Sequence, residues 1–240
     1  MRGEITIAAL GLVCLGSACA LPVRHATVPA VAMACPRGCP DQLPVQGQAA
    51  VDEMLRHPTV VEQARQLVRT SERSLLANYE KGERFHPMIE EELARQGIPA
   101  ELGLIPLLES SYQPRATGRS VRGLWQLTGS TARAYGLTVN GRVDERLDPR
   151  KSTRAAAAYL DDLYDQFDDW GLAIAAYNAG PARIEWALRR RPGADVFDLA
   201  RARLLPAVTR RYVPKLMATA LALTEPESLA HVSQTGRRPS

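Results

Sequence analysis

One short apolar run restricts the fold of this chain more than any other feature. The run from Leu102 to Leu108 lies among prolines and ends directly before Glu109. Pro99 can occupy the first turn of a helix, where a missing backbone donor has no cost, and Pro106 allows only a kinked or shortened continuation. Because a residue before proline avoids the helical region, the helix has ended before Pro114. Glu109 is therefore predicted to lie in or near the last turn of a helix.

The position of Glu109 predicts an unusual carboxyl group. A carboxylate at the end of a helix faces the negative end of the helix dipole, and apolar neighbours reduce its contact with water. Both effects disfavour the charged form, so we expect a raised pKa. A carboxylic acid of this kind can protonate a leaving oxygen and then accept a proton as the carboxylate. The alternative, for Glu109 taken alone, is a solvated glutamate at a helix end.

The rest of the central region is predicted to be helical. Apolar residues recur at helical spacing from Val60 to Tyr79 and from Pro87 to Gln96. Capping residues, first-turn prolines and apolar faces predict further helices, which cover 130–136, 148–167, 170–177, 181–190 and 206–223. Ser130 is expected to cap the first of these and Asp148 the second. We therefore expect an all-α domain in which N-terminal helices brace the helix that carries Glu109.

The net charge limits the class of partner. The 240 residues carry a formal charge of +4, and the isoelectric point is near 9.0. A modest basic excess suits an anionic polymer or a membrane surface, and it is also common on ordinary solvated faces. There is no lysine-rich block and no basic stripe interleaved with aromatic residues, so we expect no binding of nucleic acid. The sequence contains no indication of the oligomeric state.

The cysteines all lie near the start of the chain, at Cys14, Cys19, Cys35 and Cys39. The helical region therefore needs no disulfide and offers no thiol nucleophile. Cys35 and Cys39 either pair in an oxidising compartment or are incidental residues of a tether. No second ligand pair follows them at a spacing that suits zinc. We expect neither a metal nor an organic cofactor.

The N-terminus has the features of an export signal. Arg2 precedes an apolar stretch from Ile5 to Leu15, and small residues follow. Cleavage after Ala20 would release a secreted protein. The sequence around Cys19 also resembles a lipoprotein box, with Gly16 where a larger apolar residue is usual. Secretion and membrane anchoring through Cys19 both remain open.

Composition divides the chain into four predicted segments. The two ends lack helical periodicity, and the lead-in is rich in proline and alanine. The segments are a signal peptide at 1–20, a tether at 21–50, a helical domain at 51–229 and a disordered tail at 230–240.

Four short motifs occur in order along the chain. They are LIPLLESSYQPRA around Glu109, GLWQ at 123–126, AYNAG at 176–180 and TRRYV at 209–213. Each is weak alone, but in this order and spacing they resemble the motifs of the SLT-type lytic transglycosylases. The region from Val51 to Leu229 is similar to the catalytic domain of the membrane-bound lytic murein transglycosylase D group. In that family a glutamate usually stands directly before the threonine of the last motif, and this chain has Val208 at that position.

The resemblance implies a lysozyme-like (goose-type, SLT) catalytic domain that acts on the glycan strands of peptidoglycan in the periplasm. It implies that Glu109 is the catalytic residue and that the substrate is bound by Ser110, Gln126, Tyr177, Asn178 and Tyr212. For Trp125, which precedes Gln126, the sequence does not decide between a packing role and a role in the site. Glu109 would protonate the oxygen between N-acetylmuramic acid and N-acetylglucosamine and then activate the muramic C6 hydroxyl. The product would be 1,6-anhydro-N-acetylmuramic acid.

An ordinary glycosidase needs a second carboxylate beside the scissile bond. The candidates are Asp144, Glu145 and Asp148, of which Asp148 is expected to cap a helix, while the other two are expected in surface ion pairs. We therefore favour a mechanism with one acid, in which the N-acetyl group of the substrate stabilises the developing charge. The alternatives are a lysozyme-like muramidase that uses water, a non-catalytic glycan-binding scaffold and a helical interaction domain. A calcium site among the acidic residues of 161–169 is disfavoured, because they lack the ligand spacing of a calcium loop and are expected on a solvated helix face.

Overall fold

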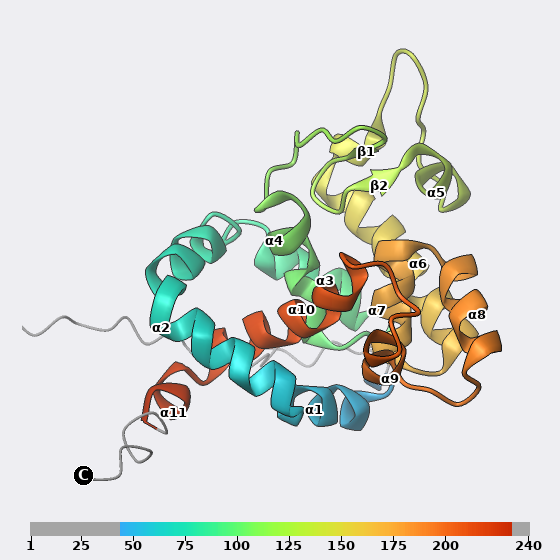
Figure 1. Ribbon diagram of the computed structural model, residues 1–240. Coiled ribbons are helices and arrows are strands. Elements are labelled where there is room, and N and C mark those ends of the chain that lie inside the picture. Colours follow the sequence, from blue (N-terminus) through green and yellow to red (C-terminus); the bar gives the residue numbers. More distant parts are fainter. Residues whose placement is uncertain (1–43, 232–240) are drawn as a thin grey trace, which may run out of the picture.

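A computed structural model describes residues 44–231 of the chain (Figure 1). The predicted export signal, most of the tether and most of the tail lie outside these residues. The described part consists mainly of helices, with one two-stranded antiparallel sheet. The expected all-α class is therefore confirmed.

The elements follow one another with short connections. The helices are α1 (Gln48–Arg56), α2 (Pro58–Glu80), α3 (His86–Ala94), η1 (Ala100–Leu104), α4 (Ile105–Ser110), α5 (Gly129–Ala134), η2 (Glu145–Leu147), α6 (Pro149–Phe167), α7 (Trp170–Ala179), α8 (Pro181–Arg190), α9 (Val196–Arg201), α10 (Thr209–Thr224) and α11 (Pro226–His231), where η marks a 3-10 helix. The strands β1 (Val121–Arg122) and β2 (Leu127–Thr128) form a hairpin between α4 and α5.

Helix α10 lies at the centre of the fold. It packs against α2 and also contacts η1, α1, α7, α9 and α11. Between Tyr212 and Leu223 every residue of α10 except Lys215 is buried. Its many alanines let neighbouring helices approach closely, because the distance between packed helices depends on the side chains at the contact. The N-terminal half of this helix carries Tyr212.

The N-terminal helices form the predicted brace. Helix α2 begins at Pro58, and the imidazole of His57 caps it by accepting a hydrogen bond from the amide of Thr59 at 3.2 Å. Helix α3 contacts η1 on one side and α6 on another. Helix α1 begins at Gln48, a few residues before Val51, where the helical domain was predicted to start.

The segment before Glu109 is divided into two short helices. The 3-10 helix η1 is followed directly by α4, in which Pro106 occupies the first turn. A proline inside one continuous helix would lack its own amide and its ring would clash with the carbonyl of Leu102. Starting a new helix at Ile105 avoids both problems, and this confirms the predicted shortening.

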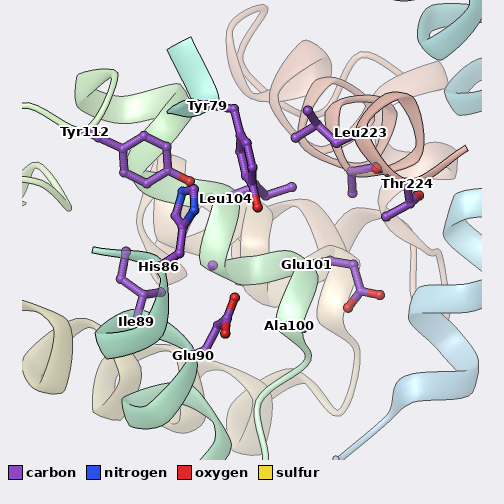
Figure 2. A pocket seen from close by; sticks show the side chains of 12 residues that line it. Tyr79, His86, Ile89, Glu90, Ala100, Glu101, Leu104, Tyr112, Leu223 and Thr224 are labelled. Atoms are coloured by element: carbon purple, nitrogen blue, oxygen red, sulfur yellow. Dashed lines mark hydrogen bonds between the residues drawn. The ribbon is translucent and has the colours of Figure 1, made fainter. Parts of the chain in front are cut away.

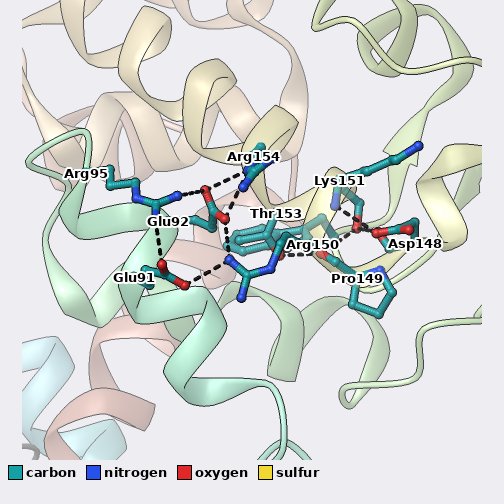
Figure 3. Close-up of polar contacts among 11 residues, drawn as sticks. Glu91, Glu92, Arg95, Asp148, Pro149, Arg150, Lys151, Thr153 and Arg154 are labelled. Atoms are coloured by element: carbon teal, nitrogen blue, oxygen red, sulfur yellow. Dashed lines mark hydrogen bonds and ion pairs between the residues drawn. The ribbon is translucent and has the colours of Figure 1, made fainter.

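A cluster of charged residues fastens α3 to α6 (Figure 3). Glu92 on α3 is only 4% exposed and accepts hydrogen bonds from Arg95, Arg150 and Arg154. Its neighbour Glu91, which is far more exposed, pairs with Arg95 and Arg150. Because Arg150 and Arg154 belong to α6, the buried carboxylate joins two helices that are distant in sequence.

The caps of α6 and α7 are both aspartates. Asp148 accepts a hydrogen bond from the amide of Lys151 at 2.9 Å, which confirms the predicted cap. Asp169 accepts from the amide of Leu172 at 2.7 Å and is half-buried. The prediction that the acidic residues of 161–169 all lie on a solvated helix face is therefore wrong for Asp169, because a capping carboxylate is held against the start of the next helix.

Two local predictions are wrong. The cap of α5 is Thr128, whose hydroxyl accepts from the amide of Thr131 at 3.1 Å, whereas Ser130 lies within the first turn. Helix α9, capped by Asp195, lies between the helices predicted at 181–190 and 206–223, where the sequence predicts no helix. The hairpin was also not predicted, because two residues per strand are too few to show an alternating pattern.

Candidate active site

Glu109 lies in the last turn of α4, as predicted. The helix ends directly after Ser110 because Ser111 and Tyr112 have positive φ values, 50° and 57°. Such angles are uncommon for residues other than glycine. The amides of these two residues still donate to the carbonyls of Leu107 and Pro106, so the turn is closed by hydrogen bonds. The carboxyl group of Glu109 thus leaves the helix at its negative end.

The carboxyl group of Glu109 is half-buried and bonded to one phenol. The hydroxyl of Tyr212 donates to Glu109 Oε1 at 2.6 Å. Burial raises the pKa of Glu109, while the hydrogen bond from Tyr212 and the positive charge of Lys215 act in the opposite direction. Burial and the charge of Glu109 raise the pKa of Tyr212 well above its ordinary value, so its phenol stays protonated near neutral pH. The site therefore combines a carboxyl of raised pKa with a fixed hydrogen-bond donor.

Tyr177 joins the second and third motifs. It lies near the end of α7, and its hydroxyl donates to the carbonyl of Trp125 at 2.7 Å. Burial, and next the charge of Glu109, raise the pKa of Tyr177 well above its ordinary value, so this ring also lies near the carboxylate. The Trp125 side chain is fully buried, and its indole nitrogen donates to the hydroxyl of Thr153 at 2.8 Å. Trp125 therefore has a packing role.

Gln126 is held in a fixed orientation by the loop before it. Its Nε2 donates to the carbonyl of Gly123 at 2.7 Å and to that of Ala116 at 3.3 Å. No described residue bonds to its Oε1, so this oxygen is available as an acceptor. Gly123 has a φ of 82°, and a Cβ atom there would lie 1.9 Å from the carbonyl oxygen of Arg146, so only glycine fits.

Ser110 does not offer its hydroxyl to solvent. The side chain is buried, and its Oγ lies 2.9 Å from the carbonyl of Leu124 and 3.1 Å from that of Pro106. These contacts join the end of α4 to the GLWQ segment. These contacts give Ser110 a role in holding the two segments together.

Asn178 connects α7 to the start of α10. Its Oδ1 accepts a hydrogen bond from the hydroxyl of Thr209 at 2.9 Å, and within 44–231 no partner bonds to its Nδ2. Val208, where the family usually has glutamate, is 71% exposed and provides no side-chain cap for α10. The contact between Asn178 and Thr209 links the third and fourth motifs.

Hydrogen bonds connect all four motifs, and the charge of Glu109 acts directly on Tyr177 and Tyr212.

Sequence reasoning missed Lys215, although it lies three residues after Tyr212 and hence on the same face of a helix. It also missed Arg146, which is buried and donates to the carbonyl of Leu127 at 3.2 Å. No local pattern distinguishes this arginine, because its acceptors come from distant segments.

The three candidates for a second carboxylate all have partners in the protein. Asp144 pairs with Arg146 at 2.7 Å, and both side chains are largely buried, so the prediction of a surface pair is wrong for Asp144. Glu145 pairs with Lys151, which agrees with the prediction. Asp148 caps α6. These contacts lower the pKa of Asp144 and of Glu145, chiefly through the hydrogen bonds from Arg146 and Lys151.

The described region contains neither a candidate metal site nor a candidate membrane span. Within 44–231 no three His, Cys, Asp or Glu side chains are grouped so that they could hold a metal ion. No helix in this part of the chain has the length and apolar character needed to span a membrane.

Comparisons with known proteins agree with the motifs. Residues 86–197 match the family model of the transglycosylase SLT domain, so the TRRYV motif lies beyond the matched range. Membrane-bound lytic murein transglycosylase D of Escherichia coli is 38% identical over 133 residues, which cover 53% of this chain and 28% of that relative. Membrane-bound lytic murein transglycosylase F of Pseudomonas putida is 40% identical over 92 residues, which cover 35% and 18%. The chain thus matches less than a third of the length of these relatives.

Solved structures agree with the fold. The 70 kDa soluble lytic transglycosylase SLT70 of Escherichia coli covers 73% of this chain, with a TM-score of 0.52 and 23% identity, and this chain covers 32% of it. This likeness concerns the lysozyme-like helical fold alone. The match of residues 86–197 to the family model, with the similarity to the E. coli enzyme, shows that this part of the chain resembles a transglycosylase SLT domain.

Proposed function

We propose that this chain is a lytic transglycosylase of peptidoglycan. It cleaves the β-1,4 bond between N-acetylmuramic acid and N-acetylglucosamine and forms 1,6-anhydro-N-acetylmuramic acid. The observation that carries the proposal is the half-buried carboxyl of Glu109, whose pKa is raised by burial and whose Oε1 is bonded to Tyr212 at 2.6 Å. The names of the relatives, which are lytic murein transglycosylases, support the same activity.

The proposed mechanism uses Glu109 twice. In its acid form it protonates the glycosidic oxygen, and the bond to the muramic sugar breaks while the acetamido group of that sugar stabilises the positive charge. The resulting carboxylate then accepts the proton of the C6 hydroxyl, whose oxygen closes the anhydro ring. Glu109 ends the cycle protonated, so no water is consumed.

The neighbouring residues have supporting roles in this proposal. Tyr212 orients Oε1 and leaves the other carboxyl oxygen for the proton transfer. Gln126 Oε1 and Asn178 Nδ2, which no described residue binds, are an acceptor and a donor for sugar hydroxyl or acetamido groups. Ser110 and Tyr177 hold the backbone segments around the carboxylate.

The pairing of the other carboxylates supports a mechanism with one acid. A retaining or inverting glycosidase needs a second free carboxylate. Asp144 and Glu145 are bound to Arg146 and Lys151, and Asp148 is bound to a helix amide. A general acid contributes about 10²–10⁴-fold to a rate, so removal of the Glu109 carboxyl should lower turnover by about that factor.

The test compares Glu109→Gln with Glu145→Gln on purified sacculi, with mass spectrometry of the released muropeptides. We expect anhydro ends from the wild type and from Glu145→Gln, and no release by Glu109→Gln although it remains folded. Normal release by Glu109→Gln would overturn the role of Glu109. Reducing ends from the wild type would indicate a hydrolase, and sacculus binding without release by the wild type would indicate a scaffold.

We also propose that the chain is exported to the periplasm by residues 1–20 and that 21–50 connect the exported end to the domain at 51–229, with a tail at 230–240. Mass spectrometry of the mature protein distinguishes the two open forms. Cleavage after Ala20 gives a free N-terminus at Leu21, whereas anchoring gives a lipid-modified Cys19 that is lost in Cys19→Ser. An intact Met1 in the cell envelope fraction would contradict both.

A further inference from the structure

A cavity with apolar walls and a few polar groups lies away from Glu109 and its partners. It has a volume of about 120 Å³ and is lined by side chains from the end of α2, from α3, from η1 and from the end of α10 (Figure 2). That volume is well above the roughly 10–15 Å³ that one water molecule needs. None of the residues assigned to the candidate active site lines it.

Unpartnered polar atoms are concentrated at this cavity. Of the four buried side-chain nitrogen and oxygen atoms without a hydrogen bond in the described region, three belong to its lining, namely Tyr112 Oη, His86 Nε2 and Glu101 Oε2. Tyr112 is only 2% exposed. An unpaired buried polar atom costs about 1–3 kcal/mol. Three such atoms at one place therefore indicate a missing ligand rather than a random defect.

Each of the three unpaired atoms can accept a hydrogen bond, and two carboxylates lie around them. Glu90 and Glu101 have no ion pair with any residue of the described region, although Glu101 Oε1 accepts a hydrogen bond from Gln48 Nε2 at 3.4 Å. Figure 2 shows the carboxylate of Glu90 and the hydroxyl of Tyr112 pointing toward the same space. Burial lowers the pKa of His86, so its imidazole is neutral near pH 7 and can accept a hydrogen bond. A fitting ligand therefore supplies donors and positive charge.

The remaining walls are aromatic and aliphatic. The Tyr79 and His86 rings are stacked with centroids 4.3 Å apart, and Tyr112 meets His86 edge-on at 5.0 Å. Leu104 and Leu223 complete the apolar part. Aromatic faces attract ammonium groups, and aliphatic walls favour a short hydrocarbon chain.

We propose that this cavity binds a primary alkylammonium group, with the ammonium directed toward Glu90 and Glu101 and the hydrocarbon chain against Leu104 and Leu223. An ammonium has three donors and no acceptor, which matches the unpaired set. A sugar would bring acceptors that the site cannot satisfy, and an anion would meet two carboxylates. This inference does not depend on the proposed cleavage of peptidoglycan.

The test is an NMR titration of the ¹⁵N-labelled full chain at pH 7 with n-butylammonium chloride, using n-butanol and sodium chloride as reference ligands. We expect saturable shifts for amides around the cavity, with a dissociation constant on the order of millimolar. Glu90→Gln should weaken binding at least tenfold. Glu83→Gln, an exposed substitution near His86, should bind as the wild type does, and thermal melting should show both variants folded.

Three results would overturn the proposal. The first is chemical shifts that do not saturate with butylammonium, and the second is equal binding of butanol and butylammonium. The third is unchanged binding of butylammonium by both Glu90→Gln and Glu101→Gln. Each of these results would leave the cavity as a site for water. Glu109→Gln should still bind butylammonium, and Glu90→Gln should still release muropeptides. Failure of the cavity proposal is thus distinguishable from failure of the proposed enzyme activity.

Discussion

Substitution of Glu92 by glutamine tests how much the buried carboxylate between α3 and α6 stabilises the domain. Its Oε1 accepts from Arg150 and Arg154, and its Oε2 accepts from Arg95 and Arg154 (Figure 3). Both oxygens are thus occupied by donors. In Glu92→Gln the amide nitrogen must face one of these donors whichever way it is turned, because glutamine has only one acceptor oxygen.

The expected loss follows from these contacts. At least two hydrogen bonds to a charged group are removed, and each contributes about 1.5 kcal/mol or more. The free energy of unfolding should therefore fall by about 3 kcal/mol, which corresponds to roughly 6–12 °C in Tm for a chain of this size. The arginines are about half exposed, so water can solvate them after the change, and this limits the loss.

The matched control is Glu91→Gln. Glu91 shares two of the three arginine partners of Glu92, namely Arg95 and Arg150, but its side chain is 43% exposed, against 4% for Glu92. Its amide can turn toward water, so the expected loss is below about 1 kcal/mol. Urea unfolding of both variants in low and high salt measures the difference, and only the Glu91 contribution should be screened away. Equal losses for the two variants would refute the reasoning that burial decides the strength of these pairs.

Three further outcomes are expected. Glu109→Gln should raise the free energy of unfolding at pH 7 by about 0.5–2 kcal/mol. The raised pKa of Glu109 gives stability that is present below the ordinary pKa of about 4.3 and is lost as the pH rises through the raised value. Equal gains at pH 4 and pH 7 in urea unfolding would contradict this. Tyr212→Phe removes a hydrogen bond that lowers the pKa of Glu109, so the alkaline limb of the pH–rate profile should move to higher pH. The rate should also fall at least about tenfold. An alkaline limb that does not move would argue against the contact between Tyr212 and Glu109. Trp125→Phe loses the bond to Thr153 and should lower the free energy of unfolding by about 1–3 kcal/mol, measured by the same method, and an unchanged value would show that this bond contributes little.

Local signals predicted the features that depend on neighbouring residues. The start of α6 follows from Asp148 and Pro149, because a cap and a first-turn proline act within one turn. The short helix before Glu109 follows from Pro106 in the same way. The cap of α5 was misassigned to Ser130 because Thr128 lies two residues earlier and both hydroxyls can serve. Local signals of this kind cannot choose between adjacent candidates.

Contacts between distant segments could not be read from the sequence. Ser110 is turned toward the carbonyl of Leu124, and Tyr177 toward that of Trp125, so each hydroxyl has a partner in a distant segment. The pairing of Glu92 with Arg150 and Arg154 likewise joins residues about sixty positions apart. Each of these residue types is more often exposed, and only the packing of helices determines its partner.

The sequence by itself determined where Glu109 lies on its helix and that the chain folds as helices, because prolines, caps and apolar spacing act over a few residues. The tertiary structure alone decided how this carboxyl is buried and which group it meets. Tyr212 is 103 positions away along the chain, and it reaches Glu109 only because α10 packs through the centre of the domain. Burial and a proton donor set the pKa of a carboxyl, and both are properties of the packed structure rather than of the local sequence.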